Sequence, residues 1–463
     1  MEAAIILVFV MGYLAITLEH SIKIDKLIPA LVMMAICWAL IALGLESFPQ
    51  WFDSGKHALL ENFGAFEHEE KMHLMEETLL HHLGKTAEIL VFLLGAMTIV
   101  EIIDYFDGFA TIKGFIRTKK KTKILWIFSI LAFILSAIID NLTATIVLIS
   151  ILQKIVKDRD VRIWYAGLII IAANAGGAWS PIGDVTTTML WIGKKVTTGH
   201  LIGYLFIPSL LCMIVPSLIA SFLPAFKGDL NIVEDKEKTK SRFSGTMLYL
   251  GLGAIVFVPI FKMITHLPPY VGMMLSLGVV ATFAEIYSSS KFSMSGHDSE
   301  EHDAHAHHSP VHHSLSKIEL PSILFFLGIL MAVAALESLG ILFGAADWLR
   351  ESTPQLGTEM HAGGVSDLVV LFLGVGSAVI DNVPLVAASL GMFSEPLDHE
   401  LWHFIAYSAG TGGSMLIIGS AAGVVAMGME KIDFFWYLKK ISWLALVGFL
   451  VGAAAFMVTR TLF

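Results

Sequence analysis

The sequence has few charged residues and very little cysteine. Asp, Glu, Lys and Arg together make up 15% of its 463 residues, whereas soluble domains carry about 25%. Both cysteines, Cys37 and Cys212, lie in apolar runs, so the sequence predicts neither a disulfide framework nor a zinc site. Strict apolar–polar alternation is also missing, which argues against a membrane β-barrel. The net charge of −10 is concentrated in loops and gives no reason to expect a nucleic-acid partner.

Long apolar runs occupy most of the chain instead. Hydrophobic residues make up 56% of it, and the mean hydropathy is +0.75. Apolar runs of about 18 or more residues are typical of helices that cross the ~30 Å hydrocarbon core of a bilayer. The first run has neither a basic leader nor a small-residue cleavage site, so we expect a retained span. An all-α polytopic membrane protein in contact with the lipid bilayer is therefore predicted. Its ten crossings fall at residues 3–18, 27–45, 87–106, 163–192, 201–223, 247–261, 271–286, 323–342, 401–429 and 441–458.

Two further apolar stretches, residues 124–153 and 367–393, each carry an Asp-Asn pair at the centre. The first reads Ser-Ala-Ile-Ile-Asp-Asn up to Asn141, and the second reads Ser-Ala-Val-Ile-Asp-Asn up to Asn382. Basic clusters flank the first stretch on both sides. Because basic loops remain on the cytoplasmic side, a re-entrant hairpin that enters and leaves on that side keeps both clusters inside. Acidic segments flank the second stretch, so we expect a hairpin that enters from outside.

The Asp-Asn pairs also divide the chain into two similar halves. Alignment of Asp140 with Asp381, 241 positions later, brings the first three spans of the two halves into register. Each half then has three spans, one hairpin and two spans, of which one is broken. Five crossings are an odd number, so the halves have opposite orientations in the membrane. Such inverted repeats, with binding sites near the midplane, are common in secondary transporters.

Each hairpin is followed by a span with helix-breaking residues at its centre. Residues 163–192 contain Gly-Gly-Ala-Trp-Ser-Pro-Ile-Gly-Asp, and residues 401–429 contain paired glycines at matching positions. Glycine pairs and proline interrupt a helix, which a membrane tolerates only where the backbone is enclosed by protein or lines a cavity. The ends of the half-helices then offer carbonyl oxygens to a cation. The matching residues are Gly176, Gly177, Gly183 and Asp184 in the first half, and Gly412, Gly413, Gly419 and Ser420 in the second.

Three acidic residues, Asp140, Asp184 and Asp381, are expected at membrane depth. A charge there costs at least ~2.5–3.5 kcal/mol on insertion scales and therefore indicates a functional site. No Lys or Arg occurs in the hairpins or broken spans, so we expect carboxylates without a fixed basic partner that bind a cation and a proton in alternation. A structural salt bridge with a loop lysine such as Lys85 stays open. Candidate cation- or proton-binding residues are Asp140, Asn141, Thr143, Asn174, Asp184, Thr186, Thr187, Ser377, Asp381 and Asn382, with Na⁺ at Asp140 and Asp184.

The remaining polar segments carry weaker signals. Glu101 and Asp104, near the cytoplasmic end of the third span, are candidates for proton access, or an interfacial pair at a helix end. Residues 46–85 are expected to form an acidic external loop with a short amphipathic surface helix. Residues 226–243 form a cytoplasmic linker, and residues 288–316 a histidine-rich cytoplasmic loop. Histidine tracts can bind metal or titrate near neutral pH, but a solvated linker is the simpler interpretation.

These motifs resemble the ion transporter superfamily, which includes dicarboxylate and citrate carriers, arsenite permeases and NhaD-type Na⁺/H⁺ antiporters. The resemblance rests on Asp-Asn-Leu-Thr-Ala-Thr from Asp140 and on the paired glycines followed by Pro-Ile-Gly. Dicarboxylate carriers of this superfamily have Ser-Asn-Thr at both hairpin tips, whereas this chain has Asp140 and Asp381 there. With Asp184 directly after Pro-Ile-Gly, the pattern looks like the NhaD type.

The resemblance implies a non-enzymatic exchange of Na⁺ or Li⁺ for H⁺, with no cofactor, by a homodimer. It also implies that a transport domain, residues 124–225 and 367–463, moves in elevator fashion against a scaffold, residues 1–107 and 244–345. A bacterial inner membrane is the expected location. An anion carrier of the same fold, for dicarboxylate or arsenite, is the first alternative. A membrane sensor or metal-binding protein that uses the histidine-rich loop is the second.

Overall fold

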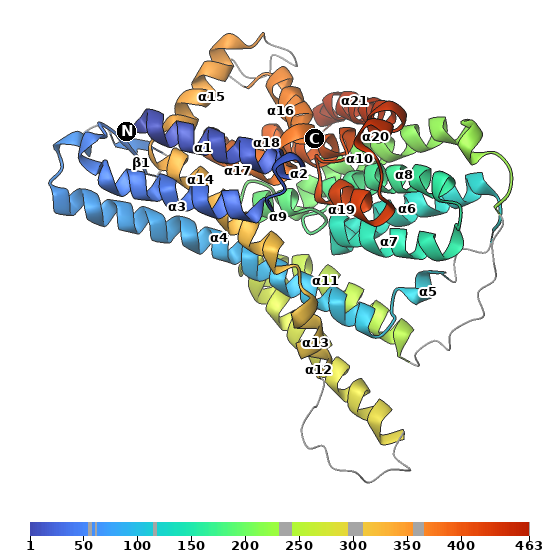
Figure 1. Cartoon of the computed structure of the whole chain (residues 1–463). Helices are drawn as coiled ribbons and strands as arrows, with labels where there is room; N and C mark the ends of the chain where they lie inside the picture. The colour runs from blue at the N-terminus through green and yellow to red at the C-terminus, as the bar shows by residue number, and fades with distance from the viewer. Residues whose placement is uncertain are drawn as a thin grey trace.

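The structure is a computed structural model, and it describes residues 1–53, 58–60, 63–113, 118–230, 243–294, 309–354 and 365–462. These residues are mostly helical (Figure 1). The first half contains α1 (Glu2–Thr17), α2 (Glu19–Ile22), α3 (Leu27–Leu43), α4 (His68–Tyr105), α5 (Ala110–Lys113), α6 (Lys121–Ile139), α7 (Asn141–Ile155), α8 (Arg159–Ala178), α9 (Val185–Ile192) and α10 (Thr198–Ser221).

The second half repeats this pattern of long and short helices. It contains α11 (Ser244–Thr265), α12 (Pro269–Met294), α13 (Pro310–Lys317), α14 (Leu320–Ser338), α15 (Ile341–Ser352), α16 (Asp367–Ile380), α17 (Asn382–Met392), α18 (Glu400–Gly412), α19 (Ala421–Glu430), α20 (Phe434–Lys440) and α21 (Ser442–Thr459). Short 3₁₀ turns are η1 (Leu45–Ser47), η2 (Phe63–Ala65), η3 (Pro224–Phe226), η4 (Gly413–Met415) and η5 (Arg460–Leu462).

Eight of the described helices are long and apolar enough to cross a membrane, namely α4, α6, α8, α10, α11, α12, α14 and α21. Helices α1 and α3 are equally apolar but have 16 and 17 residues. Large Ile, Leu, Val and Met side chains lie exposed along α1, α3 and α11, as expected of surfaces that face lipid rather than water. The prediction of an all-α polytopic membrane protein is confirmed at this level.

The helices pack into two groups. In the first, α3 lies against α1 and α14, and α4 lies against α12 and α14. In the second, α6 packs on α8, α16 on α18, and α10 on α21. Figure 1 shows α3 and α4 extended to one side and α6, α7 and α8 gathered at the other. The groups meet where α17 contacts both α14 and α18, and where α9 contacts both α4 and α17.

Each Asp-Asn pair sits where two helices meet at a sharp turn. Asp140 separates α6 from α7 with φ 72° and ψ 160°, and Asp381 separates α16 from α17 with φ 62° and ψ 146°. Backbone angles of this kind are favoured by glycine and cost other residues about 1–3 kcal/mol. The two aspartates offset this cost, because each carboxylate accepts a backbone N–H from the start of the helix that follows.

Several sequence-based boundaries are wrong. The external loop predicted for residues 46–85 is too long, because α4 begins at His68 and runs unbroken for 38 residues. Its start is fixed by a capping box in which Glu67 and Glu70 bind each other's backbone N–H groups. The predicted span 323–342 ends early, at Ser338, and Gly340, with φ 71°, directly precedes α15.

Two further regions complete the comparison with the sequence. A small antiparallel sheet was not anticipated in an all-α chain: β1 (Trp51–Asp53) pairs with β2 (Ala58–Leu60), with Trp51 opposite Leu60. Most of the histidine-rich loop, residues 295–308, and most of the linker, residues 231–242, lie outside the described residues.

Candidate functional site

The centre of the second helix group is held together by glycine contacts that recur in both halves. A Cβ atom on Gly176 of α8 would lie 2.2 Å from the carbonyl oxygen of Phe133 in α6. In the second half, a Cβ on Gly412 of α18 would lie 2.1 Å from the carbonyl oxygen of Gly374 in α16. Only glycine permits helix backbones to approach so closely. Phe133 and Gly374 are separated by the same 241 positions as the two aspartates.

The two breaks, between α8 and α9 and between α18 and α19, lie beside these contacts. Each break leaves the N-terminus of the following helix, α9 or α19, at the centre of the helix group. Gly177 and Gly183 face each other across the first break, and Gly413 and Gly419 across the second. Asp184 then caps α9, and Ser420 caps α19. The two caps have nearly the same backbone conformation, with φ and ψ of −148° and 148° at Asp184 and −146° and 152° at Ser420.

Asp184 lies at the junction of both hairpins and is buried. Its Oδ1 accepts hydrogen bonds from the backbone N and the hydroxyl of Thr186, both at 2.9 Å. From the first hairpin tip, Asn141 Nδ2 donates to Asp184 Oδ2 at 2.7 Å. From the second tip, Asn382 Nδ2 lies 3.3 and 3.2 Å from Asp184 Oδ1 and Oδ2. One carboxylate therefore joins α9, α7 and α17.

The network continues from Asn141 into the second broken segment. Asn141 Nδ2 also lies 3.0 Å from Asn174 Oδ1 in α8, and Asn174 Nδ2 donates to Ser420 Oγ at 3.0 Å. All three side chains are buried. The network includes Ser420, which aligns with Asp184 and which the sequence offers, as an alternative to Ser414, as a source of oxygen in the second half.

Asp140 is bound by its own helix rather than by this network. Its Oδ1 accepts the backbone N–H of Thr143 at 2.8 Å, and its Oδ2 accepts the Thr143 hydroxyl at 2.9 Å. Both bonds are local, so the side chain is held in place without a basic partner.

Asp140 and Asp184 border one small cavity of about 20 Å³. Apart from Thr188 of α9, its other lining residues are apolar, and they come from α4, α11 and α12 as well as from the first hairpin and the start of α9. Of the residues that the structure describes, no basic one lines it. A volume of this size accommodates about one water-sized particle, so the two carboxylates share a space fit for a single small ion.

Asp381 departs from the sequence-based expectation, because it has a fixed basic partner. Lys26, the residue before α3, places its Nζ 3.1 Å from Asp381 Oδ2. The prediction that the membrane carboxylates lack such a partner is therefore wrong for Asp381. Lys26 is 355 positions from Asp381 in the sequence, and the predicted span 27–45 begins one residue after it. The signal that could have indicated it is Pro384, which stands where Thr143 stands in the first half and has neither N–H nor hydroxyl to donate.

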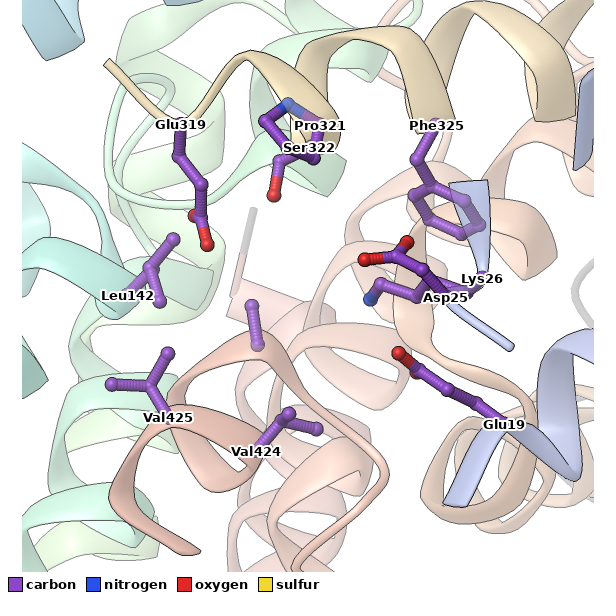
Figure 2. Close-up of a pocket in the computed structure, with 11 residues that line it drawn as sticks. Glu19, Asp25, Lys26, Leu142, Glu319, Pro321, Ser322, Phe325, Val424 and Val425 are labelled. Carbon is purple, nitrogen blue, oxygen red and sulfur yellow. The ribbon is translucent and has the colours of Figure 1, made fainter. Parts of the chain in front are cut away.

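Beside Lys26 the structure has a second, larger cavity of about 140 Å³ (Figure 2). Glu19, Asp25, Lys26 and Glu319 project into it together with apolar side chains of α7, α14 and α19. It lies where the two helix groups meet, and three of its four charged residues are acidic.

The remaining predicted residues lie outside the network. The Thr187 hydroxyl donates to the carbonyl oxygen of Asp184 at 2.9 Å, and the Ser377 hydroxyl donates to the carbonyl oxygen of Ala409 at 2.7 Å. In both hydrogen bonds the acceptor is a backbone carbonyl oxygen, so these two side chains stabilise the backbone around the site. Glu101 and Asp104 lie near the end of α4, and among the described residues no hydrogen bond joins them to Asp140 or Asp184.

Comparisons with known proteins agree with this arrangement. The family model described as "Citrate transporter" matches residues 13–402. The chain is 41% identical over its full length to "Sodium/proton antiporter 1" of Arabidopsis thaliana, of which it covers 73%. It is 30% identical, over 94% of its length and 86% of the relative, to "Na(+)/H(+) antiporter NhaD" of Alkalimonas amylolytica.

A solved structure supports the fold. The YdaH transporter of Alcanivorax borkumensis has a TM-score of 0.58 and covers 94% of this chain and 98% of its own. Its sequence identity is 12%, so the likeness concerns the fold alone. Each of these relatives is named as a transporter, none as an enzyme. The chain therefore belongs to the citrate transporter family and, within it, to the NhaD-type transporters.

Proposed function

We propose that this protein is a secondary active transporter that exchanges Na⁺ or Li⁺ for H⁺ across its membrane. The observation that carries the proposal is the cavity bordered by Asp140 and Asp184, whose lining, within the described part of the chain, includes no basic residue. Two relatives that match nearly the whole chain are named sodium/proton or Na⁺/H⁺ antiporters. Together, the shared cavity and the shared sequence favour cations as the transported ions.

Exchange follows from the chemistry of the two carboxylates. A small hard cation takes oxygen ligands, and Asp140 and Asp184 supply carboxylate oxygens around one space. A proton on either carboxylate removes the charge that attracts the cation. Na⁺ and H⁺ therefore compete for the same groups, and the site carries one in each direction. Asn141, Asn382 and Thr186 donate hydrogen bonds to Asp184 and so fix the position of its carboxylate, which lines the cavity.

An anion carrier of the same family fold is disfavoured by the charges at the site. A dicarboxylate or arsenite site needs positive charge or several donors without a nearby acid. Counting the residues that the structure describes, the small cavity is lined by two acids and no base, and the larger cavity by three acids and one base. An anion would be repelled from both.

We further propose that the chain consists of two inverted repeats with ten crossings and two re-entrant hairpins, α6–α7 and α16–α17. The recurring glycine contacts and the matched conformations of Asp184 and Ser420 support this plan. In it, α6–α10 and α16–α21 form a transport unit that moves in elevator fashion against α1–α4 and α11–α14, and the protein is a homodimer. The relatives include plant and bacterial proteins, so location in a bacterial inner membrane stays a prediction.

Purified protein in liposomes tests the proposed function. An outward proton gradient, acid inside, is expected to drive uptake of radioactive Na⁺, and a gradient of the opposite sign its release. Asp184→Asn and Asp140→Asn should abolish this uptake, whereas Asp160→Asn, which removes an exposed carboxylate that does not line the cavity, should leave it unchanged. Uptake that does not respond to the proton gradient, or that survives Asp184→Asn, would contradict the proposal, as would faster transport of succinate or arsenite.

A further inference from the structure

The two hairpin tips satisfy their aspartates in different ways. Asp140 takes both of its hydrogen bonds from Thr143, two groups on its own helix. Asp381 has Pro384 at the corresponding place, and a proline can donate neither bond. Its Oδ1 accepts the backbone N–H of Asn382 at 2.8 Å, and its Oδ2 is bound by Lys26. An ammonium group therefore replaces the missing donors.

Lys26 belongs to the other helix group. It directly precedes α3, and its Nζ also lies 4.6 Å above the ring of Phe325 in α14, a favourable cation–π contact. Helices α3 and α14 pack against each other, so the position of the ammonium is fixed by the group that does not contain the hairpins. The ion pair with Asp381 thus connects the two groups across their boundary.

A cation can approach this ion pair from the larger cavity. Lys26 lines the cavity, and Glu19, Asp25 and Glu319 surround it with carboxylates (Figure 2). The side chains of Lys26 and Asp381 are 22% and 13% exposed, so the ion pair is partly accessible to solvent. The acidic walls raise the local concentration of cations beside Lys26, the partner of Asp381.

We propose that Lys26 is the resident counter-ion of Asp381. A transported cation or proton that binds to Asp381 displaces Lys26, and this displacement frees the second hairpin from α3. The inference deepens the proposed cation/proton exchange and rests on it. In the unloaded protein the Lys26–Asp381 pair keeps α17 docked on the first helix group. Loading of Asp381 breaks the pair and permits the hairpin to move. Lys26 is then a positioning residue that competes with Na⁺ rather than a ligand of it.

The test compares Lys26→Gln with Lys26→Arg, which keeps the positive charge, and with Lys23→Gln, which removes an exposed charge from the same loop. Transport in liposomes gives the KM for Na⁺ of each protein. Lys26→Gln is expected to lower that KM by about fivefold, the factor that corresponds to the upper range for a partly exposed ion pair. Lys26→Arg and Lys23→Gln should keep the wild-type KM. An unchanged or raised KM in Lys26→Gln would overturn the proposal.

Hydrogen exchange supplies a readout that does not depend on transport. In Na⁺-free buffer, amides at the tip of the second hairpin should exchange at least about fivefold faster in Lys26→Gln than in the wild type. On an Asp381→Asn background the same substitution should have no further effect. Equal rates of amide hydrogen exchange in the wild type and Lys26→Gln would show that the ion pair does not hold the second hairpin in place, even if Na⁺/H⁺ exchange is established. If Lys26→Gln does not purify as a folded protein, Lys26→Met, which keeps the stem over Phe325, replaces it in both measurements. Absence of any Na⁺/H⁺ exchange in the wild type would instead refute the proposed function. Faster amide hydrogen exchange in Lys26→Gln would then still support the proposal that the Lys26–Asp381 pair holds the second hairpin against the first helix group.

Discussion

Substitution of Gly176 by alanine tests whether close helix packing sets the geometry of the ion site. The added methyl group would lie 2.2 Å from the Phe133 carbonyl oxygen, a backbone atom that cannot rotate away. Ordinary contact begins at 3.4 Å, so α8 must move from α6 by about 1.2 Å at this point. Asn174 lies two residues before Gly176, and its oxygen is 3.0 Å from Asn141 Nδ2. A shift of about 1.2 Å lengthens this 3.0 Å distance beyond the range of a hydrogen bond. It therefore separates α8 from the first hairpin tip.

We expect Gly176→Ala to reduce the maximal rate of Na⁺/H⁺ exchange by about 100-fold, the typical cost of a 1 Å misplacement of a reacting group. The assay is exchange in liposomes, normalised to the amount of folded protein. Gly412→Ala, with its 2.1 Å contact, should behave alike, whereas Gly199→Ala, with no neighbour within 4 Å, is the control. Equal rates for Gly176→Ala and Gly199→Ala would refute the reasoning, as would a variant that folds less well but transports normally per molecule.

Two further predictions concern charges outside the cavities. Arg162 Nε lies 2.7 Å from both carboxylate oxygens of Glu430, which is buried. Arg162→Gln should therefore lower the free energy of unfolding by about 3 kcal/mol, measured by thermal unfolding in detergent. Arg159→Gln should cost less, because Arg159 donates to the backbone carbonyl oxygens of Glu430 and Lys431 rather than to the buried carboxylate. Glu46 accepts hydrogen bonds from Lys71 and then His68, which hold its pKa below the usual range. A lowered pKa in the folded state stabilises the protein above the ordinary glutamate pKa and loses this effect as the pH falls through the folded-state value. Glu46→Gln should therefore lower the thermal midpoint at pH 7 but not in strong acid, and an equal loss at both pH values would contradict this.

The sequence predicts features that depend on local pattern. The apolar runs, the Asp-Asn pairs and the Gly-Gly and Pro-Ile-Gly segments are short-range signals, and they correctly indicated a helical membrane protein of the NhaD type. The structure also brings Asn141, Asn174, Asp184 and Asn382 into one hydrogen-bonded network. Their role in ion transport stays a prediction that the experiments above address.

What the sequence does not reveal depends on contacts between distant segments. Lys26 and Asp381 are 355 positions apart, and nothing beside Lys26 in the chain distinguishes it from any loop lysine. The long α4 was missed for a similar reason: its first turns are polar and read as a loop, but Lys71 is buried beside Glu46 and over the ring of Phe63. Tertiary contacts stabilise a helix there that hydropathy alone does not predict.

Binding of Na⁺ to the purified protein at several pH values tests the central claim most directly. Isothermal titration calorimetry gives the Kd for Na⁺ without any need for transport, and the matched variants are Asp184→Asn and Asp160→Asn. If Na⁺ and H⁺ compete for Asp140 and Asp184, the Kd should rise by about tenfold per pH unit for each displaced proton as the pH falls through the range in which the site is protonated. Asp184→Asn should abolish binding, and Asp160→Asn should not alter it. A Kd that does not change with pH, or that survives Asp184→Asn, would contradict the account.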